Sequence, residues 1–517
     1  MKKKYVRWTL WTIASPFILF IILCILIYLP PIQNFLVDKA AVYASEATGM
    51  NISVGRISLS FPLNLVVTNV DAASPHNDTL LSVRRLQVNV QLLPLLKKQV
   101  EVDGISLQGA TVNSNDLIHG MKLNGTLGEL FISSHGVALD PETAIVNKVL
   151  LKDTDLSLCL NDTAAADTAA SDTAYWKIIL QDIDLQNVSF ALDMPLDSLS
   201  LAASLDNAIL RDGLIDLHKS AYSLQTFRIE NGRVRYDNGK PLAADSLSSG
   251  LDPSHIALTD IGVKLDSLYY GGRNMKAIIS QFVLKERSGV EIVSATGRMV
   301  SNDKVLRVPS LKLETRDSYL ELNAAMDWNA LDFKDEGLVS ARLMADIGKP
   351  DVVRFMGSMD EKFIRQYPSE PLRIRTGIDG DLNKLKLTTL TAELPGALGL
   401  FARGELTHLT DSLLRGGDIT LEAETKDLKF VSTLAEGIEI PYGTRLEGKF
   451  TMAGTKMGTD LLLMQPEAQA VVAADTIPIT VYNDSISVAD DFKMERAARL
   501  FAKYDLSRDR HEADLAV

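Results

Sequence analysis

Carboxylates two residues apart are the side chains of this sequence best placed for catalysis. Asp153 and Asp155 form one such pair, and Asp182 and Asp184 form another. Two carboxylates on one side of a strand could share the acid and base roles of glycoside hydrolysis. The same spacing is ordinary on the solvated face of a strand, because side chains two residues apart point the same way. We therefore expect these acids to be structural.

Other catalytic and metal-binding motifs are incomplete. Residues 301–304 read Ser-Asn-Asp-Lys, which matches S-x-x-K without its companion motifs. Residues 379–383 begin like a calcium loop, but Lys384 and Leu390 stand where glycine and glutamate are needed, so a hairpin turn is expected. None of the seven histidines has another within five residues, which excludes a helical zinc motif. The sequence predicts no enzyme activity, no metal and no cofactor.

Strands are the elements that would carry these side chains. After Gly49, apolar and polar residues alternate in many stretches, among them 86–92, 156–160, 183–185, 188–192, 320–326 and 419–424. This period of two is typical of strands with one apolar and one solvated face. Pairs such as Asn231-Gly232 and Asp379-Gly380 suit the turns between them. The predicted fold is mainly β, an elongated, curled, antiparallel-type sheet with repeat-like strands, and a series of separate β domains is the alternative.

The N-terminus carries a predicted membrane anchor. Residues 8–29 are uncharged and mostly apolar, and as a helix they would reach about 33 Å, enough to cross a bilayer core of about 30 Å. The large side chains that we expect to hold this anchor in the membrane are Trp8, Trp11, Phe17, Phe20 and Leu29. The basic residues of the tail 1–7, which favour a cytoplasmic N-terminus, are Lys2, Lys3, Lys4 and Arg7. An amphipathic helix is predicted over 32–48, ahead of the β region 50–517.

Composition narrows the remaining classes. The net charge of −13, from 53 basic and 66 acidic residues, argues against a nucleic-acid partner. Cys24 lies in the anchor and Cys159 is alone, so an intrachain disulfide is not expected. Residues 161–174 repeat Asp-Thr-Ala and are predicted to form a solvated loop. Residues 349–370 are predicted to form a helical or irregular insertion, while 490–504 fits either a helix or a strand.

The order of segments over 32–113 is distinctive. A helix that ends in Ala47-Thr48-Gly49 is followed by a Val-Gly-Arg-Ile strand, a Phe-Pro turn and an Asn-Val strand. Leu-Ser-Val-x-x-Leu-x-Val then occupies 81–88, and Ile-x-Leu-x-Gly-Ala-x-Val occupies 105–112. This order resembles the N-terminal region of the AsmA/TamB-like family of envelope proteins. Long members of that family end in a domain that engages the outer membrane, and its pattern is missing here, which favours a shorter AsmA-type protein over TamB.

The resemblance implies a single-pass inner-membrane protein whose periplasmic β-groove binds or conducts phospholipid between the envelope membranes. It also implies an alternative, an assembly factor for outer-membrane proteins that works with an outer-membrane barrel partner and templates strands at its sheet edges. The side chains that we expect to line the groove are Val88, Val90, Leu185, Leu320, Leu322, Ile419, Leu421 and Ala423. Alternation alone is equally compatible with closed β domains that have ordinary cores, so both interpretations stay open.

Overall fold

The fold is taken from a computed structural model of the chain, which describes residues 39, 41–42, 45, 50–60, 64–74, 79–91, 102–114, 120–138, 142–161, 176–240, 250–334, 337–356, 361–433, 442–465, 496–505 and 510–516. These residues belong to two compact units, residues 1–240 and residues 241–517. Almost all of the regular structure in both units is strand, as the alternation predicts, so the mainly β fold class is confirmed.

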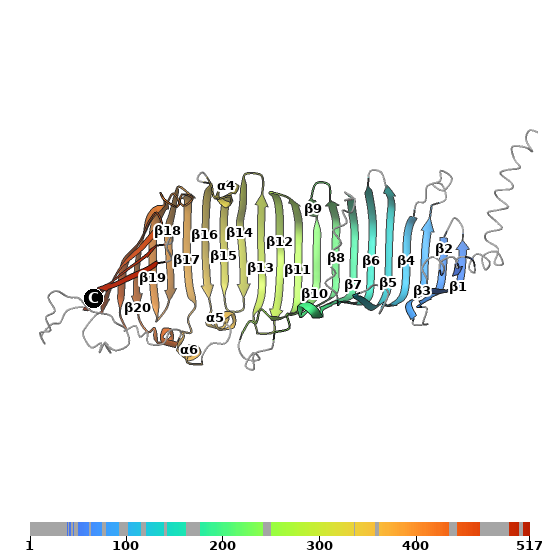
Figure 1. Ribbon diagram of the computed structural model, residues 1–517, viewed down its shortest axis with the longest axis horizontal. Coiled ribbons are helices and arrows are strands. Elements are labelled where there is room, and N and C mark those ends of the chain that lie inside the picture. The colour runs from blue at the N-terminus through green and yellow to red at the C-terminus, as the bar shows by residue number, and fades with distance from the viewer. Residues whose placement is uncertain are drawn as a thin grey trace, which may run out of the picture. The chain divides into compact units, whose positions relative to one another are not determined.

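Unit 1 is built from ten strands in its described part, and these strands stand side by side in the blue-to-green half of Figure 1. Their bounds are β1 (Asn51–Ser60), β2 (Asn64–Ala73), β3 (Thr79–Val90), β4 (Val102–Asn113), β5 (Met121–Ala138), β6 (Thr143–Leu160), β7 (Lys177–Met194), β8 (Leu199–Asp216), β9 (Ala221–Leu224) and β10 (Thr226–Asp237). A short 3-10 helix, η1 (Pro195–Asp197), joins β7 to β8. Neighbouring strands in the chain pair with each other up to β8, which pairs with both β9 and β10.

Unit 2 contains fourteen strands in its described part, and each pairs antiparallel with the next along the chain. Their bounds are β11 (His255–Gly271), β12 (Asn274–Glu286), β13 (Glu291–Ser301), β14 (Val305–Thr315), β15 (Tyr319–Asp327), β16 (Leu338–Ile347), β17 (Leu372–Asp381), β18 (Lys384–Leu394), β19 (Leu398–Thr407), β20 (Gly416–Thr425), β21 (Arg445–Ala453), β22 (Lys456–Gln465), β23 (Arg496–Asp505) and β24 (Arg510–Ala516).

Short helices lie along both edges of the unit 2 sheet, where the strands end. Helix α4 (Trp328–Leu331) is at the upper edge in Figure 1, and α5 (Lys349–Met356) and α6 (Glu361–Gln366) are at the lower edge. A 3-10 helix, η2 (Lys429–Thr433), follows β20. The predicted insertion 349–370 is therefore helical over 349–356 and 361–366 and irregular over 367–370. Of the ambiguous segment 490–504, the described residues, from Arg496 on, form strand β23.

One pair of strands departs from the predicted antiparallel sheet. Strands β6 and β7 are parallel, with Thr143 opposite Lys177 and Cys159 opposite Asp193. Parallel neighbours cannot be joined by a tight turn, so the chain must return from the end of β6 to the start of β7. The low-complexity segment 161–174 lies in this return connection and, apart from Asn161, outside the described residues.

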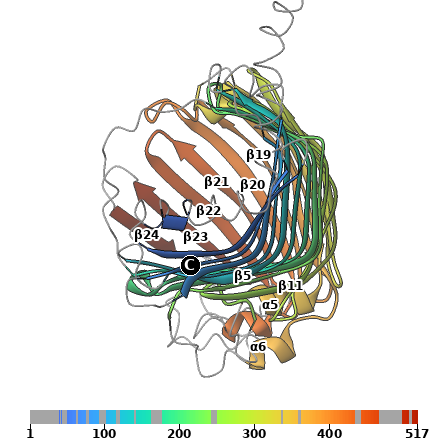
Figure 2. The same ribbon diagram turned by 90° about the vertical axis from the view of Figure 1, so that its right-hand side faces the viewer.

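The sheets are bent along their strands. Figure 2 shows this curvature for β5 in unit 1 and for β11 in unit 2. In unit 2 several strand pairs contain register shifts, for example between Val308 and Leu311 in β14, where this strand holds an extra residue. Bulges of this kind increase local twist and bend the strand that contains them.

The predicted membrane anchor 8–29 lies outside the described residues, as does most of the predicted helix 32–48. Four residues of the latter, Lys39, Ala41, Val42 and Ser45, are helical. Within the described ranges, no helix has both the length and the apolar character needed to cross a membrane.

Candidate functional site

Unit 1 presents one continuous apolar face. Residues paired across neighbouring strands have side chains on the same face, so the register defines rows that cross the sheet. Row A consists of Ile57, Val67, Leu86, Leu107, Leu130, Leu151, Leu185, Ala208 and Ile229. Row B consists of Leu59, Leu65, Val88, Ile105, Ile132, Val149, Ile183, Leu210 and Phe227. Every member of both rows is apolar.

Unit 2 has two equivalent rows. Row C consists of Val263, Phe282, Ala295, Leu313, Leu320, Ala345, Ile374, Ala392, Leu400, Ala423 and Leu446. Row D consists of Leu265, Ile279, Gly297, Leu311, Leu322, Leu343, Thr376, Leu390, Ala402, Leu421 and Gly448. Neither row contains a charged residue, and Thr376 is their one polar member.

The opposite face of each sheet is charged. In unit 1, Arg211 contacts Asp182 and Asp184, the latter at 3.0 Å. In unit 2, Lys285 lies 2.9 Å from Asp260, and the hydrogen bond between them raises the pKa of Lys285. Exposed ion pairs add little stability, so their main effect is to keep this face hydrated.

The apolar face of unit 1 is not sealed by a second layer in its described part. The buried apolar residues of this unit are Ala72, Leu80, Val83 and Ala208, and both buried hydrophobic clusters lie in unit 2. The row A and row B positions of β1, Ile57 and Leu59, are half-buried, whereas their polar neighbours are exposed. The apolar side is therefore the less accessible side, as expected for the concave face of a curled sheet. We call this face the trough of each unit.

A line of unusual backbone positions crosses the unit 1 sheet beside row A. Asn69, Asp153 and Asn187 have φ of 52°, 50° and 52°, a left-handed conformation that is uncommon for residues other than glycine. In each strand, one residue of this line has no partner in the register, while the residues before and after it are paired. These residues are Gly55, Asn69, Arg84, Gly109, Gly128, Asp153, Asn187 and Asp206. We call this line the crease.

Glycine is required at points along the crease. A Cβ on Gly128 would lie 2.8 Å from the Cβ of Asp153, and one on Gly55 would lie 3.0 Å from the Cβ of Asn69. The left-handed residue shifts the alternation by one, so that Leu151 before it and Leu156 after it face the same side. The crease thus bends the strands and keeps the trough apolar on both sides of the bend.

Two clusters of side chains cover the margins of the trough in unit 2. The lower cap consists of Phe363, Tyr367, Leu394, Ala397, Leu428 and Phe430, and its three rings lie 5.1 to 5.7 Å apart. Burial in this cap raises the pKa of Tyr367. The upper cap consists of Ala330, Val339 and Leu382, with Met326, Ile378, Leu385 and Leu409 packed against it.

The predicted groove-lining residues lie on the trough faces. Val88 belongs to row B and Leu185 to row A, while Val90 follows Val88 at the end of β3. Row C includes Leu320 and Ala423, and row D includes Leu322 and Leu421. Ile419 pairs with Gly404 and Phe450, two residues from Leu421 on the same face. The predicted anchor residues and the basic residues before them lie outside the described part of the chain.

The two acidic pairs considered for catalysis form hydrogen bonds and ion pairs with side chains of neighbouring strands. Asp153 accepts a hydrogen bond of 2.9 Å from Asn187, and Asp155 accepts one of 2.7 Å from Ser189. Asp182 and Asp184 share Arg211. All four belong to polar ladders between β6, β7 and β8, as the solvated-strand interpretation predicts.

The other motifs lie in turns. Asn302 accepts hydrogen bonds from the backbone of Lys304 and Val305, both at 2.9 Å, so residues 301–304 form the β13–β14 turn. The would-be calcium loop is the β17–β18 hairpin, in which Asp381 accepts a hydrogen bond from the Lys384 backbone. No group of acids, histidines or cysteines in the described ranges could hold a metal.

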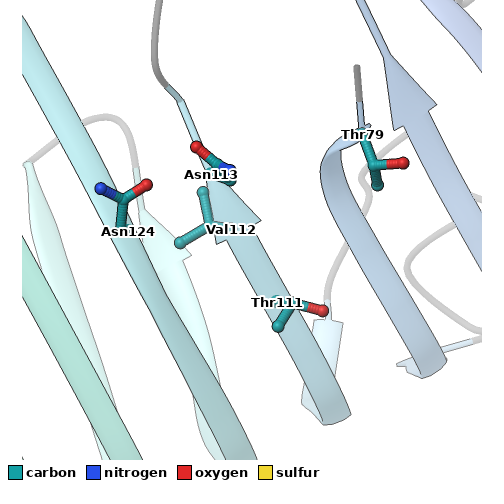
Figure 3. Close-up of a pocket in the computed structure, with 5 residues that line it drawn as sticks. All are labelled: Thr79, Thr111, Val112, Asn113 and Asn124. Carbon is teal, nitrogen blue, oxygen red and sulfur yellow. The ribbon is translucent and has the colours of Figure 1, made fainter. Parts of the chain in front are cut away.

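Figure 3 shows a small depression at the end of β4, where hydroxyl and amide side chains surround a single valine: Thr79, Thr111, Val112, Asn113 and Asn124. A site of this composition has no group able to act as a general acid or base. The trough is thus the surface feature of these units with the most distinctive chemistry.

Comparison with known proteins adds no relative. No family model matches this chain, and no curated protein matches it.

Proposed function

We propose that this protein is anchored in the inner membrane and that its troughs bind and conduct phospholipid between the membranes of the envelope. The observation that carries the proposal is that rows A to D hold no charged residue and, apart from Thr376, no polar one, beside a charged opposite face. A half-exposed apolar face of this extent is unusual for a protein without a ligand or partner, because exposed apolar patches mark interaction sites.

The physical gain lies in keeping acyl chains out of water. Each methylene group moved from water to an apolar surface is stabilised by about 0.8 kcal/mol. Because rows A to D contain no charge, an acyl chain would meet a similar environment at each successive strand of a unit. Movement from strand to strand then needs no catalytic residue, and the headgroup can stay in water at the open side of the trough.

The anchor and topology belong to the same proposal. A single span over residues 8–29 with the basic tail in the cytoplasm would hold the β units in the periplasm, next to a source of phospholipid. The N-terminal segments resemble AsmA-type envelope proteins, which favours this placement.

Assembly of outer-membrane proteins with a barrel partner is the second candidate. It is favoured by β1, which pairs with one strand, β2, in the described part and so ends the unit 1 sheet. An edge strand can add a strand from another protein through backbone hydrogen bonds. Crosslinks from β1 to segments of barrel proteins would support this candidate over lipid conduction.

A transfer assay tests the first candidate. Purified full-length protein is mixed with donor vesicles that contain a fluorescent phospholipid and with unlabelled acceptor vesicles. Transfer should be faster than with the vesicles alone and should rise with protein concentration. A rate equal to that of the vesicles alone would contradict lipid conduction.

A further inference from the structure

The two caps of unit 2 cover opposite margins of the trough at the same strands. In β17, Leu372 packs against the lower cap and Ile378 packs against the upper cap. These residues are six positions apart, or about 20 Å along the strand. Between them only Ile374 and Thr376 face the trough, so the exposed strip is two rows wide at this strand.

The caps also border the trough at the strands that follow β17. The lower cap includes Leu394 at the end of β18 and packs against Leu398 at the start of β19, while the upper cap packs against Leu385 near the start of β18. In unit 1 the described residues form no buried cluster of this kind, so its trough has no comparable cover.

Both caps are fixed to the sheet. Val352 of α5 packs against the lower cap, and Asp351 of the same helix is fully buried and accepts hydrogen bonds from Thr315 and, at 2.6 Å, from Ser318. Arg354 of the same helix contacts Asp317 at 2.8 Å. At the upper edge, the Trp328 indole donates a 2.6 Å hydrogen bond to the Asn302 carbonyl. The narrow strip therefore exists before any ligand binds.

We propose that this strip, rows C and D between the two caps at β17 and β18, is a constriction that holds the acyl chain of a phospholipid more closely than the rest of the trough. The inference rests on the proposed function. An acyl chain that lies here along either margin contacts the sheet and the cap beside it, so it buries more of its surface than on an open sheet face. The strip should therefore be the preferred binding site and the slowest step of passage.

Bulky substitutions test the constriction. The full-length protein is placed in vesicles of phosphatidylethanolamine and phosphatidylglycerol, with a photocrosslinking residue at Leu311 in β14 or at Leu446 in β21. Thr376→Phe fills the strip, Ala277→Phe adds the same ring to the trough in β12 outside both caps, and Ala325→Phe adds it to the charged face. We expect Thr376→Phe to lower phospholipid adducts at Leu446 at least tenfold and to leave those at Leu311 unchanged. Ala277→Phe should change both by no more than twofold, and Ala325→Phe should change neither.

A second measurement needs no bulky variant. Leu394 is 4% exposed beneath the lower cap, whereas Ala392, two residues away on the same face, lies in the strip. A photocrosslinking residue at Ala392 should give at least tenfold more phospholipid adducts than one at Leu394. Equal labelling at these positions, or equal losses from Thr376→Phe and Ala277→Phe, would overturn the constriction and leave lipid conduction standing. If the unsubstituted protein gives no adduct at Leu311 and none at Leu446, the proposed function itself fails.

Discussion

A lysine in place of Leu151 should block lipid movement through unit 1. Leu151 is half-buried in row A and pairs with Leu130 and Leu185. A fully extended acyl chain places about four methylene groups across the roughly 4.8 Å between strands. A charged ammonium group keeps its water and would leave these groups uncovered, at a cost of about 3 kcal/mol. Lipid occupancy at this strand should then fall roughly 100-fold.

The neighbouring leucine provides a matched control. Leu150 lies on the opposite face, between Phe131 and Asp184, so Leu150→Lys adds the same charge to the hydrated side. The assay measures phospholipid adducts from a photocrosslinking residue at Leu185, together with the transfer rate. Leu151→Lys should abolish both signals, and Leu150→Lys should preserve them. Equal behaviour of the two variants, with both proteins folded, would refute the trough as the lipid path.

Three further predictions concern the fold that shapes the trough. Gly128→Ala should destabilise unit 1 by about 1–3 kcal/mol in urea denaturation, because the new Cβ would lie 2.8 Å from that of Asp153. Gly399→Ala is the control, because a Cβ at this position would meet nothing within 4 Å. Phe430→Ala should lower the stability of the lower cap by about 3 kcal/mol, seen as faster hydrogen exchange in α6, and unchanged exchange would contradict the packing described. The hydrogen bond with His255 lowers the pKa of Asp252 below its usual 3.8. The ionised Asp252 therefore stabilises the fold above pH 3.8, and this stabilisation is lost as the pH falls through the lower pKa that Asp252 has in the folded protein. The Ser254 amide donates a hydrogen bond of 2.9 Å to Asp252. The protection factor of this amide, which is the exchange rate of an unfolded peptide at the same pH divided by that of the amide, should therefore fall with acid below about pH 4, and Asp252→Asn should remove this dependence.

Alternation predicted the strands well because it reports directly on which side chains meet water. The apolar residues of 86–90, 320–326 and 419–424 fall in β3, β15 and β20 with the expected parity, and Leu92 lies outside the described residues. The turn pairs were less accurate. Asp379 and Gly380 lie in the last residues of β17, and the turn of this hairpin is formed by Leu382 and Asn383. Asn231-Gly232, also predicted as a turn, lies inside β10, where Asn231 has a left-handed φ of 53°. Local sequence marks a backbone position that favours left-handed φ but cannot tell a turn from an irregularity within a strand. The dominance of strands over helices was thus predictable from local pattern.

The crease and the parallel pair were not predicted, since each depends on residues far apart in the sequence. Asp153 and Asn187 stand 34 positions apart, and only the pairing of β6 with β7 brings them together. One signal was available in the sequence. The apolar positions change from odd numbers up to Leu151 to even numbers from Leu156, which indicates that one residue between them interrupts the alternation. The parallel pairing had no such signal, because both strands carry the same alternation.

The distinction between trough and core also required the structure. Alternation describes one apolar face and cannot say whether another layer covers it. In unit 1 few side chains on that face are buried, whereas in unit 2 Phe363 and Phe430 lie in a cap formed by α6 and η2. These aromatic residues come from the connections between strands, in which no alternation marks them.

The most direct test of the trough is a crosslinking scan along β20 in cells. A photocrosslinking residue is placed singly at each position from 418 to 425 of the membrane-anchored protein, and phospholipid adducts are identified by mass spectrometry. We predict adducts at Ile419, Leu421 and Ala423, which face the trough, and none at Thr420, Glu422 and Glu424. An absence of phospholipid adducts at both sets of positions would contradict the account and would favour the assembly role.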